Sequence, residues 1–442
     1  MVICHDFSFF IFYSYIYKIF RYFNKLNIAY KNKYEGKLNT RSKGGDNVKV
    51  KKFKYMALVI TPMLILSLFT YFYLFNLPKR IYINEDTNSI KVSNSIFIKD
   101  SEIVKDKLEL KLLGLIPIKS VSVSKIKDLE VYPGGLNVGI KISTNGVLVV
   151  GHSEIESLDG KIESPAKVSG IELGDIITKI NGERIENSRD LSTKLNSLEE
   201  EKISIEYMRN GINNEKEIEL GKENNEYKLG LWVRDSTAGI GTLTFYDKKT
   251  KLFGALGHPI TDGDTNSPFS VKDGNLLNSS IISIKKGEKG CPGELKGLFI
   301  NEKENIGKID KNTESGIFGV GSDNLINDVF NKPIKIGFKS EIKEGAAKII
   351  TTIDEKGPKY YEIEIIKLLS KDAVDSKGML IKITDSELLS KTGGIVQGMS
   401  GSPIIQNGKI VGAVTHVLVN KPDTGYGIYI QWMVKEANNL LK

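Results

Sequence analysis

The sequence predicts a mainly β protein with a small α+β domain and a single transmembrane helix near its N-terminus. One observation is an uncharged apolar run from Met56 to Asn76. A second is a region, residues 131–225, in which short strands alternate with two helical stretches. The third is residues 226–442, where short strands are separated by Gly and Asn turns and helix signals occur only at the extreme end. So many short strands favour a sandwich or a pair of barrels.

Charge is distributed unevenly along the 442 residues, whose net charge is +8. Residues 1–54 hold 12 Lys and Arg against 3 Asp and Glu, whereas the remaining chain is balanced at 50 and 51. A basic N-terminal segment followed by a nearly neutral remainder is typical of an oriented membrane protein. Nucleic-acid binders concentrate basic residues in the folded domain instead. We therefore expect the membrane, and not a nucleic acid, as a partner.

The apolar run Met56–Asn76 has 21 residues, enough to span roughly 30 Å of hydrocarbon as a helix. Lys51, Lys52 and Lys54 precede it, so its N-terminal side is predicted to be cytoplasmic and everything after Lys79 to lie outside. A buried core helix and a cleaved signal peptide are the alternatives. Because no small-x-small cleavage site follows the run, an uncleaved anchor is favoured.

Residues 131–225 contain the stretch "LGDIITKINGERI", Leu173 to Ile185, preceded by Gly170. A buried strand there leads into an Asn-Gly hairpin turn at Asn181 and Gly182. This stretch resembles a PDZ domain, a family that holds a peptide carboxylate on backbone N–H groups and adds the peptide to a sheet edge. The resemblance places the peptide-binding loop at Gly134, Gly135, Leu136, Asn137, Val138, Gly139 and Ile140.

The segment "GMSGSP", Gly398 to Pro403, has the form of a nucleophile turn. Glycines permit the sharp backbone angles that expose a serine Oγ and aim nearby N–H groups at an oxyanion. The segment resembles the Gly-Asp-Ser-Gly-Gly-Pro loop of chymotrypsin-like proteases, which fold as a double β-barrel. The resemblance makes Ser400 the nucleophile in preference to Ser402, with the N–H groups of Gly398 and Ser400 as the oxyanion hole.

A serine nucleophile needs a general base, and beyond the anchor the candidates are His152, His258 and His416. His258 ends an apolar strand in "GALGHPITD" and precedes Ser400 by 142 residues, so it can come from a first barrel and the serine from a second. His416 lies mid-strand after the nucleophile loop, where the protease comparison expects a pocket wall. His152 falls in the PDZ-like region and is interpreted as a polar surface residue.

The base also needs a carboxylate to orient it. Asp385 ends an alternating strand 15 residues before Ser400, and the order His, Asp, Ser matches chymotrypsin-like enzymes, although the spacing does not. Asp385 as a simple strand-end cap remains an alternative, and Asp262 and Asp264 are close to His258 but equally suit a turn.

Cysteine and histidine usage argues against metal chemistry. Cys4 and Cys291 are separated by the predicted anchor and cannot pair within one chain. With no cysteine cluster and only 4 histidines, a metal site is improbable, and no cofactor is expected.

Taken together, the anchor, the PDZ-like region, "GALGHPITD" and "TGGIVQGMSGSPIIQNGKIVGAVTHV" resemble the SpoIVB peptidases, stage IV sporulation proteins of endospore-forming bacteria. The resemblance covers roughly residues 50–442, and the extension before Lys51 departs from it. It implies that the acid is Asp385, in "IKITD". The predicted order is therefore a basic cytoplasmic extension (1–55), an anchor (56–76), a stalk or small subdomain (77–130), a PDZ domain (131–225) and a serine peptidase domain (226–442).

The resemblance also implies a biological role. The family is made in the forespore, crosses its inner membrane and acts in the space between forespore and mother cell. There it cleaves a membrane-bound inhibitor of an intramembrane metalloprotease, which then processes the precursor of sigma-K. Members cleave themselves, and their PDZ domain controls self-cleavage and target recognition.

Two other functions remain open from the residues. A membrane-anchored scaffold would bind a partner's C-terminus through the PDZ domain and keep a degenerate protease domain without turnover. Intact Ser400 and His258 argue against this. A tail-specific protease with a Ser–Lys dyad would also place PDZ before protease, but we find neither its lysine base nor its serine motif.

Overall fold

The structure is a computed structural model. It describes residues 80–85 and 98–441, apart from gaps at 113, 127–128, 159, 302–303 and 370–373, together with isolated positions 60, 61, 68 and 71. The chain divides into two compact units, Met1–Asn76 and Leu77–Lys442. Apart from those isolated positions, the predicted anchor and the basic extension before it lie outside the described residues. Within the described part of the chain, no helix is both long and apolar enough to cross a membrane.

The segment predicted as a stalk or small subdomain forms a four-stranded sheet in the order β1-β4-β3-β2. Strand β1 pairs parallel with β4, and the other neighbours are antiparallel. The strands are β1 (Arg80–Asn84), β2 (Ile98–Val104), β3 (Lys107–Leu112) and β4 (Ile116–Ile126).

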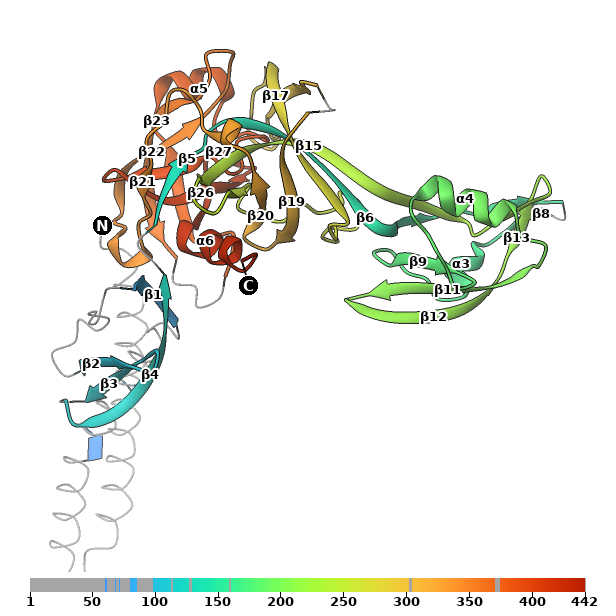
Figure 1. The fold of residues 1–442 in the computed structure, drawn as a ribbon, viewed down its shortest axis with the longest axis horizontal. Helices are drawn as coiled ribbons and strands as arrows, with labels where there is room; N and C mark the ends of the chain where they lie inside the picture. Colours follow the sequence, from blue (N-terminus) through green and yellow to red (C-terminus); the bar gives the residue numbers. More distant parts are fainter. Residues whose placement is uncertain are drawn as a thin grey trace, which may run out of the picture. The chain divides into compact units, whose positions relative to one another are not determined.

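The C-terminal third of the chain forms a closed barrel of six strands in the order β22-β23-β24-β27-β26-β25 (Figure 1). Its strands alternate as a half-buried sheet requires: in β24, Met379, Ile381 and Ile383 are buried while the residues between them are partly exposed. The elements are β22 (Gly345–Thr351), β23 (Lys359–Leu368), β24 (Met379–Ile383), α5 (Ser386–Thr392), β25 (Pro403–Gln406), β26 (Lys409–Leu418), β27 (Lys421–Tyr429) and the terminal helix α6 (Ile430–Asn438).

A first ring of six strands precedes it. Strand pairings run β6-β17-β19-β20-β16-β15, and β15 pairs directly with β6, which closes the ring. The predicted double barrel is thus present. The strands are β6 (Asn137–His152), β15 (Leu231–Asp247), β16 (Leu252–Ala255), β17 (Asp273–Lys285), β19 (Asn305–Thr313) and β20 (Gly316–Gly321), with β5 (Glu130–Pro133), β18 (Glu294–Phe299) and β21 (Ile334–Lys335) attached.

The PDZ-like part lies between β6 and β15, which run side by side out of the first ring (Figure 1). The second half of β6 pairs with β9, and β9 continues through β11 to β12. Asn181 and Gly182 both have positive φ (47° and 80°) and join β9 to β10, as the predicted Asn-Gly turn requires. The elements are β7 (Ile155–Ser157), β8 (Gly160–Ile162), α3 (Pro165–Val168), β9 (Ile176–Ile180), β10 (Glu183–Arg184), α4 (Ser188–Asn196), β11 (Lys202–Arg209), β12 (Ile212–Glu219), β13 (Gly221–Glu223) and β14 (Glu226–Lys228).

The predicted peptide-binding loop of the PDZ domain is placed elsewhere by the structure, and this prediction is corrected. Its members Gly134, Gly135, Leu136, Asn137, Val138, Gly139 and Ile140 belong to the first barrel. The N–H groups of Gly134 and Gly135 already donate to Thr244 O (2.9 Å) and Leu243 O (2.8 Å). From Asn137 on, β6 is paired with β15 on one edge and, from Val138, with β17 on the other. Neither a carboxylate nor an added strand can therefore bind there.

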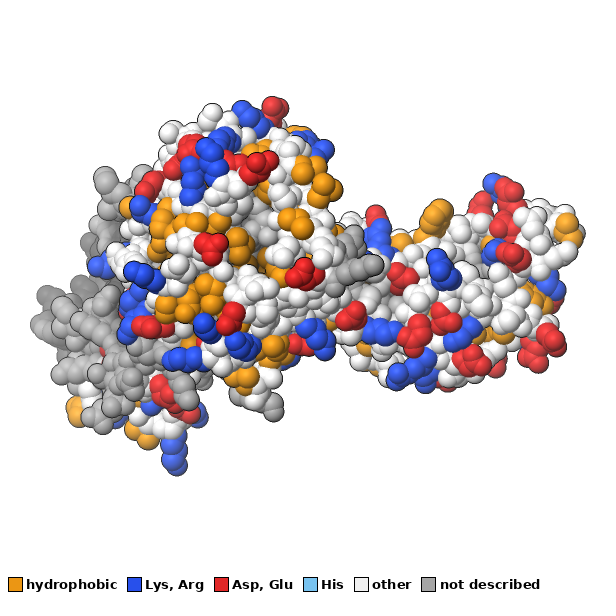
Figure 2. Space-filling view, turned by 45° about the horizontal axis from the view of Figure 1, so that its top comes forward, with side chains coloured by type: hydrophobic (Ala, Val, Ile, Leu, Met, Phe, Trp, Pro, Cys, Tyr) orange, Lys and Arg blue, Asp and Glu red, His pale blue; other side chains and the backbone are white. Residues whose placement is uncertain are grey.

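The molecular surface mixes charges of both signs. On the face drawn in Figure 2, Lys and Arg side chains are interspersed with Asp and Glu, including on the PDZ-like part. This pattern differs from the one-sign stripe typical of a phosphate-binding surface.

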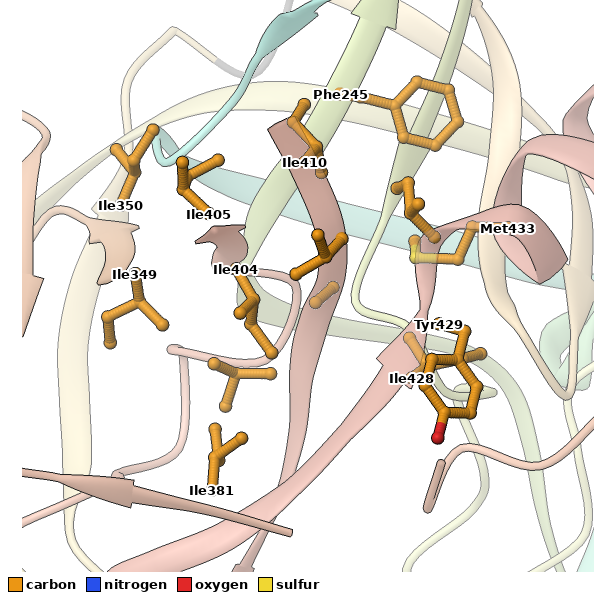
Figure 3. Close-up of a cluster of buried hydrophobic side chains, with 14 of the residues drawn as sticks. Phe245, Ile349, Ile350, Ile381, Ile404, Ile405, Ile410, Ile428, Tyr429 and Met433 are labelled. Atoms are coloured by element: carbon orange, nitrogen blue, oxygen red, sulfur yellow. The ribbon is translucent and has the colours of Figure 1, made fainter. Parts of the chain in front are cut away.

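One apolar core joins the two barrels. Phe245 of β15 packs in the same buried cluster as Ile404, Ile410 and Met433 from the second barrel and its helix. Figure 3 shows these side chains between the strands, with the further cluster members Ile349, Ile350, Ile381, Ile405, Ile428 and Tyr429. Burial of this many side chains fixes how the barrels meet, and the loops that carry Ser400 and His258 lie along that junction.

We expect Ile404→Ala, at a fully buried position, to lower the free energy of unfolding by about 2–5 kcal/mol, because it leaves a cavity in this core. Urea denaturation of the purified chain measures this. The matched control is Ile282→Ala, whose side chain is 61% exposed and which should change stability by no more than about 0.5 kcal/mol. Equal effects of the two substitutions would contradict the core as described.

Candidate active site

The serine loop is a tight, buried turn. Gly398 (φ +95°) and Gly401 (φ +96°) both take the left-handed conformation that favours glycine. A Cβ on Gly401 would also lie 2.0 Å from Thr242 O, so the close approach requires glycine there. Ser402 is fully buried and its Oγ donates to Met399 O (2.7 Å). Ser400 is only half-buried, which makes it the accessible serine of the loop.

The histidine loop meets the serine loop across the barrel junction. Leu256 and Gly257 have positive φ (68° and 76°) directly after β16 and turn the chain toward His258. A Cβ on Gly401 would lie 2.5 Å from Leu256 N, and one on Gly257 would lie 2.9 Å from Thr415 Cγ2. The loops that carry His258 and Ser400, which lie 142 positions apart in the sequence, are thereby brought together; that the two side chains act as a pair stays a prediction.

Two imidazoles occupy this junction. The rings of His258 and His416 are 4.9 Å apart between centroids and inclined by 41°. The Nδ1 of His258 lies 2.8 Å from Pro259 O, and because a carbonyl can only accept, Nδ1 carries the proton. The Nε2 atom is then left as an acceptor, the form that a general base needs. His152 lies in the PDZ-like part, with Nε2 2.9 Å from Ile171 O.

Burial keeps both imidazoles neutral. Desolvation lowers the pKa of His258, against an opposing effect of its bond to Pro259 O. Desolvation likewise lowers the pKa of His416 to about 4; the charge of Lys377 and the repulsion that two protonated imidazoles would exert on each other act in the same direction, and Asp375 opposes them. The Nδ1 of His416 is buried and has no hydrogen-bond partner among the described residues.

The hydroxyl of Ser400 is hydrogen-bonded to a backbone carbonyl. Ser400 Oγ donates to Thr415 O at 2.8 Å, one residue before His416 on the same strand. Thr415 Oγ1 in turn lies 2.6 Å from Ser376 O. Ser400 Oγ thus donates to a backbone carbonyl, and a change of its rotamer is needed before it can donate to an imidazole.

Comparison with known proteins identifies the domain around this loop. The family model described as "SpoIVB peptidase S55" matches residues 225–434. The chain therefore contains a SpoIVB peptidase S55 domain. A PDZ model matches residues 137–220, so this chain joins a PDZ domain to the peptidase domain, as its sequence predicts. The S55 domain makes the chain a serine peptidase.

Other similarities are weaker. A zinc metalloprotease, RasP of Shouchella clausii (strain KSM-K16), is 28% identical over 104 residues, which are 21% of this chain and 25% of that protein. The chain thus matches about a quarter of that relative's length. Among solved structures, the PDZ domain of the SdrC-like protein (Lmo2051) from Listeria monocytogenes is 21% identical over 21% of this chain and 90% of its own (TM-score 0.17). The Rv3671c protease in its inactive form is 12% identical over 45% of this chain and 83% of its own (TM-score 0.24).

In the S55 domain, the hydrogen bonds of Asp385 are to backbone groups and none of them is to His258. Asp385 is the N-cap of α5: its Oδ1 accepts from Leu388 N (2.9 Å) and its Oδ2 from Glu362 N (3.3 Å). The cap interpretation, left open by the sequence, describes the observed geometry.

The other predicted carboxylates are also engaged. Asp262, fully buried, pairs with Arg234 and accepts from the N–H groups of Asp264 and Thr265 (3.0 and 2.9 Å). Asp264 pairs with the same arginine at 3.0 Å. Both are thus turn residues. The carboxylate whose charge acts on His416 is Asp375, in the connection before β24, and no sequence motif distinguishes it.

The amides proposed for the oxyanion are available. The N–H groups of Met399, Gly401 and Ser402 donate to Val396 O, Val414 O and Met399 O. Those of Gly398 and Ser400 have no acceptor among the described residues. Their role stays a prediction, and the geometry leaves them free for it.

The strand edge available to a peptide in the PDZ domain is the start of β15. Leu231–Arg234 pair with β6 on one edge, and along the other edge no described strand pairs with them. Asp235 accepts from both Ser188 N and Ser188 Oγ (2.7 Å each), which ties the start of α4 to β15. Gly230, with φ +67°, forms the turn into the strand.

We expect the labelling of Ser400 by a fluorophosphonate to persist well below pH 6.5, the ordinary pKa of histidine. The neutral imidazole is the base, and burial lowers the pKa of His258, so the neutral form survives to lower pH. Labelling rates measured from pH 4 to 8 give the midpoint. His416→Phe is the control for the second imidazole and should keep a low midpoint. A midpoint at or above 6.5 would contradict the buried base.

We expect Asp385→Ala to lower the free energy of unfolding by about 1 kcal/mol and Asp385→Asn to leave it nearly unchanged, since Asn caps a helix as well as Asp does. Thermal or urea unfolding of both variants measures this, and equal losses would argue against the cap. Labelling of folded Asp385→Asn is the second measurement. A drop of about 10⁴, the cost of losing a triad carboxylate, would show that this carboxylate reaches His258 in the active enzyme.

Proposed function

We propose that this chain is a membrane-anchored, self-cleaving serine endopeptidase of sporulation signalling. It would cleave a membrane-bound inhibitor of an intramembrane metalloprotease and so trigger processing of pro-sigma-K. The observation that carries the proposal is the meeting of the Ser400 and His258 loops at the barrel junction of an S55 domain. The family implies the role in sporulation, and the residues of the site support hydrolysis of a peptide bond.

The proposed reaction uses this chain's own groups. Ser400 Oγ leaves Thr415 O, gives its proton to His258 and attacks the scissile carbonyl carbon. The N–H groups of Gly398 and Ser400 bind the oxyanion. His258 then returns the proton to the departing amine, which leaves an ester on Ser400. Water, deprotonated by His258, hydrolyses this acyl-enzyme and restores the serine. No cofactor takes part.

The proposed location follows from the sequence ahead of the S55 domain. Met56–Asn76 anchors the chain in the inner forespore membrane, and the basic residues before it stay in the cytoplasm. The PDZ and S55 domains then lie in the space between forespore and mother cell, where a membrane-bound protein substrate is within reach.

The proposed PDZ ligand is a peptide that adds to the free edge of β15 at Leu231–Asp235, opposite α4. Such β-augmentation satisfies the unpaired backbone groups of the edge. The turn at Gly230 would present its N–H groups to a terminal carboxylate. This site replaces the one that the sequence predicts at Gly134–Ile140.

A second candidate, a PDZ scaffold without turnover, is favoured by one observation. Ser400 Oγ donates to a backbone carbonyl and His258 Nδ1 contacts Pro259 O, so no assembled Ser–His–Asp triad is present in the resting arrangement. The two functions differ in whether Ser400 reacts.

We expect the full-length chain to nick itself and to be labelled by a fluorophosphonate, and Ser400→Ala and His258→Ala to stay whole and unlabelled. Gel electrophoresis after expression, with in-gel fluorescence, measures both signals. Ser402→Ala is the matched control, because Ser402 is buried and bonded within the loop, and it should still be labelled. A well-folded wild type with neither signal would favour the scaffold.

A further inference from the structure

The nucleophile loop is held by the strand next to it, β15. Thr242 Oγ1 donates to Gly398 O at 2.7 Å, and Thr242 N donates to Ser400 O at 2.9 Å. Thr244 Oγ1 donates to Gly401 O at 2.8 Å. Three carbonyls of the loop, two of them on glycines with positive φ, are thus fixed by two residues of one strand.

Burying these two hydroxyl groups carries a cost in folding free energy. Thr242 and Thr244 are both fully buried, and a buried hydroxyl costs about 1–3 kcal/mol unless it is hydrogen-bonded. Valine has the same shape and at least as strong a preference for strands, so it would keep the strand and remove only the hydroxyl and its bond to the loop carbonyl. A threonine side chain has few rotamers, and its Oγ1 therefore fixes the acceptor carbonyl in one place.

Fixing these carbonyls also fixes the catalytic groups between them. The amide planes of Gly398 through Gly401 determine where the Ser400 N–H points and where its Oγ starts. The aim of oxyanion donors decides their value, and a displacement of about 1 Å can cost roughly 100-fold in rate. The glycines cannot hold their own conformation, because glycine has the most backbone freedom to lose.

We infer that Thr242 and Thr244 are positioning residues of the serine peptidase: their side-chain hydroxyls hold the carbonyls of Gly398 and Gly401 and thereby aim the oxyanion amides and Ser400. Neither side chain touches the substrate. The inference rests on the proposed function, since it concerns how fast Ser400 reacts.

The experiment compares Thr242→Val and Thr244→Val in the full-length chain with wild type. The hydroxyl is lost while the shape stays, so we expect the second-order rate of fluorophosphonate labelling to fall about 100-fold for Thr242→Val. The labelling rate of Thr244→Val should also fall. With a peptide substrate, kcat should fall while KM and the acid limb of the pH profile stay, because neither the binding surface nor His258 changes.

Two controls separate positioning from stability. Thr242→Ser restores the hydroxyl and should recover most of the labelling rate. Thr351→Val removes a hydroxyl that is equally buried but has no hydrogen-bond partner among the described residues, and it should label like wild type. If Thr242→Val does not fold, Thr244→Val decides, because its bond to Gly401 O is independent.

The possible outcomes are distinct. A folded Thr242→Val that labels at the wild-type rate overturns the inference while leaving the peptidase intact. A slow Thr242→Val that Thr242→Ser does not rescue also overturns it, since the hydroxyl is then not the cause. A wild type that is never labelled shows instead that the proposed function has failed.

Discussion

The structure depends on one strand, β15, being continuous over 17 residues. Its start pairs with β6 beside the PDZ helix α4, its middle closes the first barrel, and its end contributes Phe245 to the core shared with the second barrel. Between middle and end lies the backbone that holds the serine loop. The backbone around Ser400 is therefore held by a strand that the PDZ-like part and the first barrel share and whose end packs in the core of the second barrel.

The junction of the barrels also desolvates the side chains that are buried in it. Both imidazoles are desolvated there, and this is the main cause of their lowered pKa values. The same low local dielectric strengthens the hydrogen bonds that hold the serine loop, and it raises the free-energy cost of any buried polar group without a hydrogen-bond partner. Burial here favours the neutral form of both rings. In the same junction, the hydroxyl of Ser400 donates to Thr415 O.

Much of this arrangement could be predicted from the sequence where local chemistry decides. The Asn181-Gly182 turn, the alternating strands and the glycine-bounded serine turn each depend on a few adjacent residues. The meeting of the loops that carry His258 and Ser400 could also be anticipated, because few histidines compete for the role of base; the catalytic pairing of the two residues stays a prediction. By contrast, the Gly134-Gly135 turn suits a peptide-binding loop equally well in isolation. Only the partners of β6 on both edges show that it belongs to a barrel.

Asp385 illustrates the same limit. An aspartate after a strand and before a helix can be a cap or a catalytic acid, and the difference lies in which backbone groups come within 3 Å of it. Thr242 and Thr244 carry a signal only in hindsight: they are two threonines at alternate positions within the otherwise apolar run from Ile240 to Tyr246. A strand face alone does not show that a glycine loop from 156 residues away will lie against it.

The position of the PDZ domain has a mechanical consequence. Residues 153–230 are inserted between β6 and β15, two neighbouring strands of the first barrel. Both strands are hydrogen-bonded in that ring, so both ends of the insertion are held in place. A cut within the insertion would leave two fragments that stay joined as one folded body. A fragment that begins at residue 225 would lack β6 altogether and would expose open edges on β15 and β17. The peptidase is thus a discontinuous unit that begins upstream of the PDZ domain.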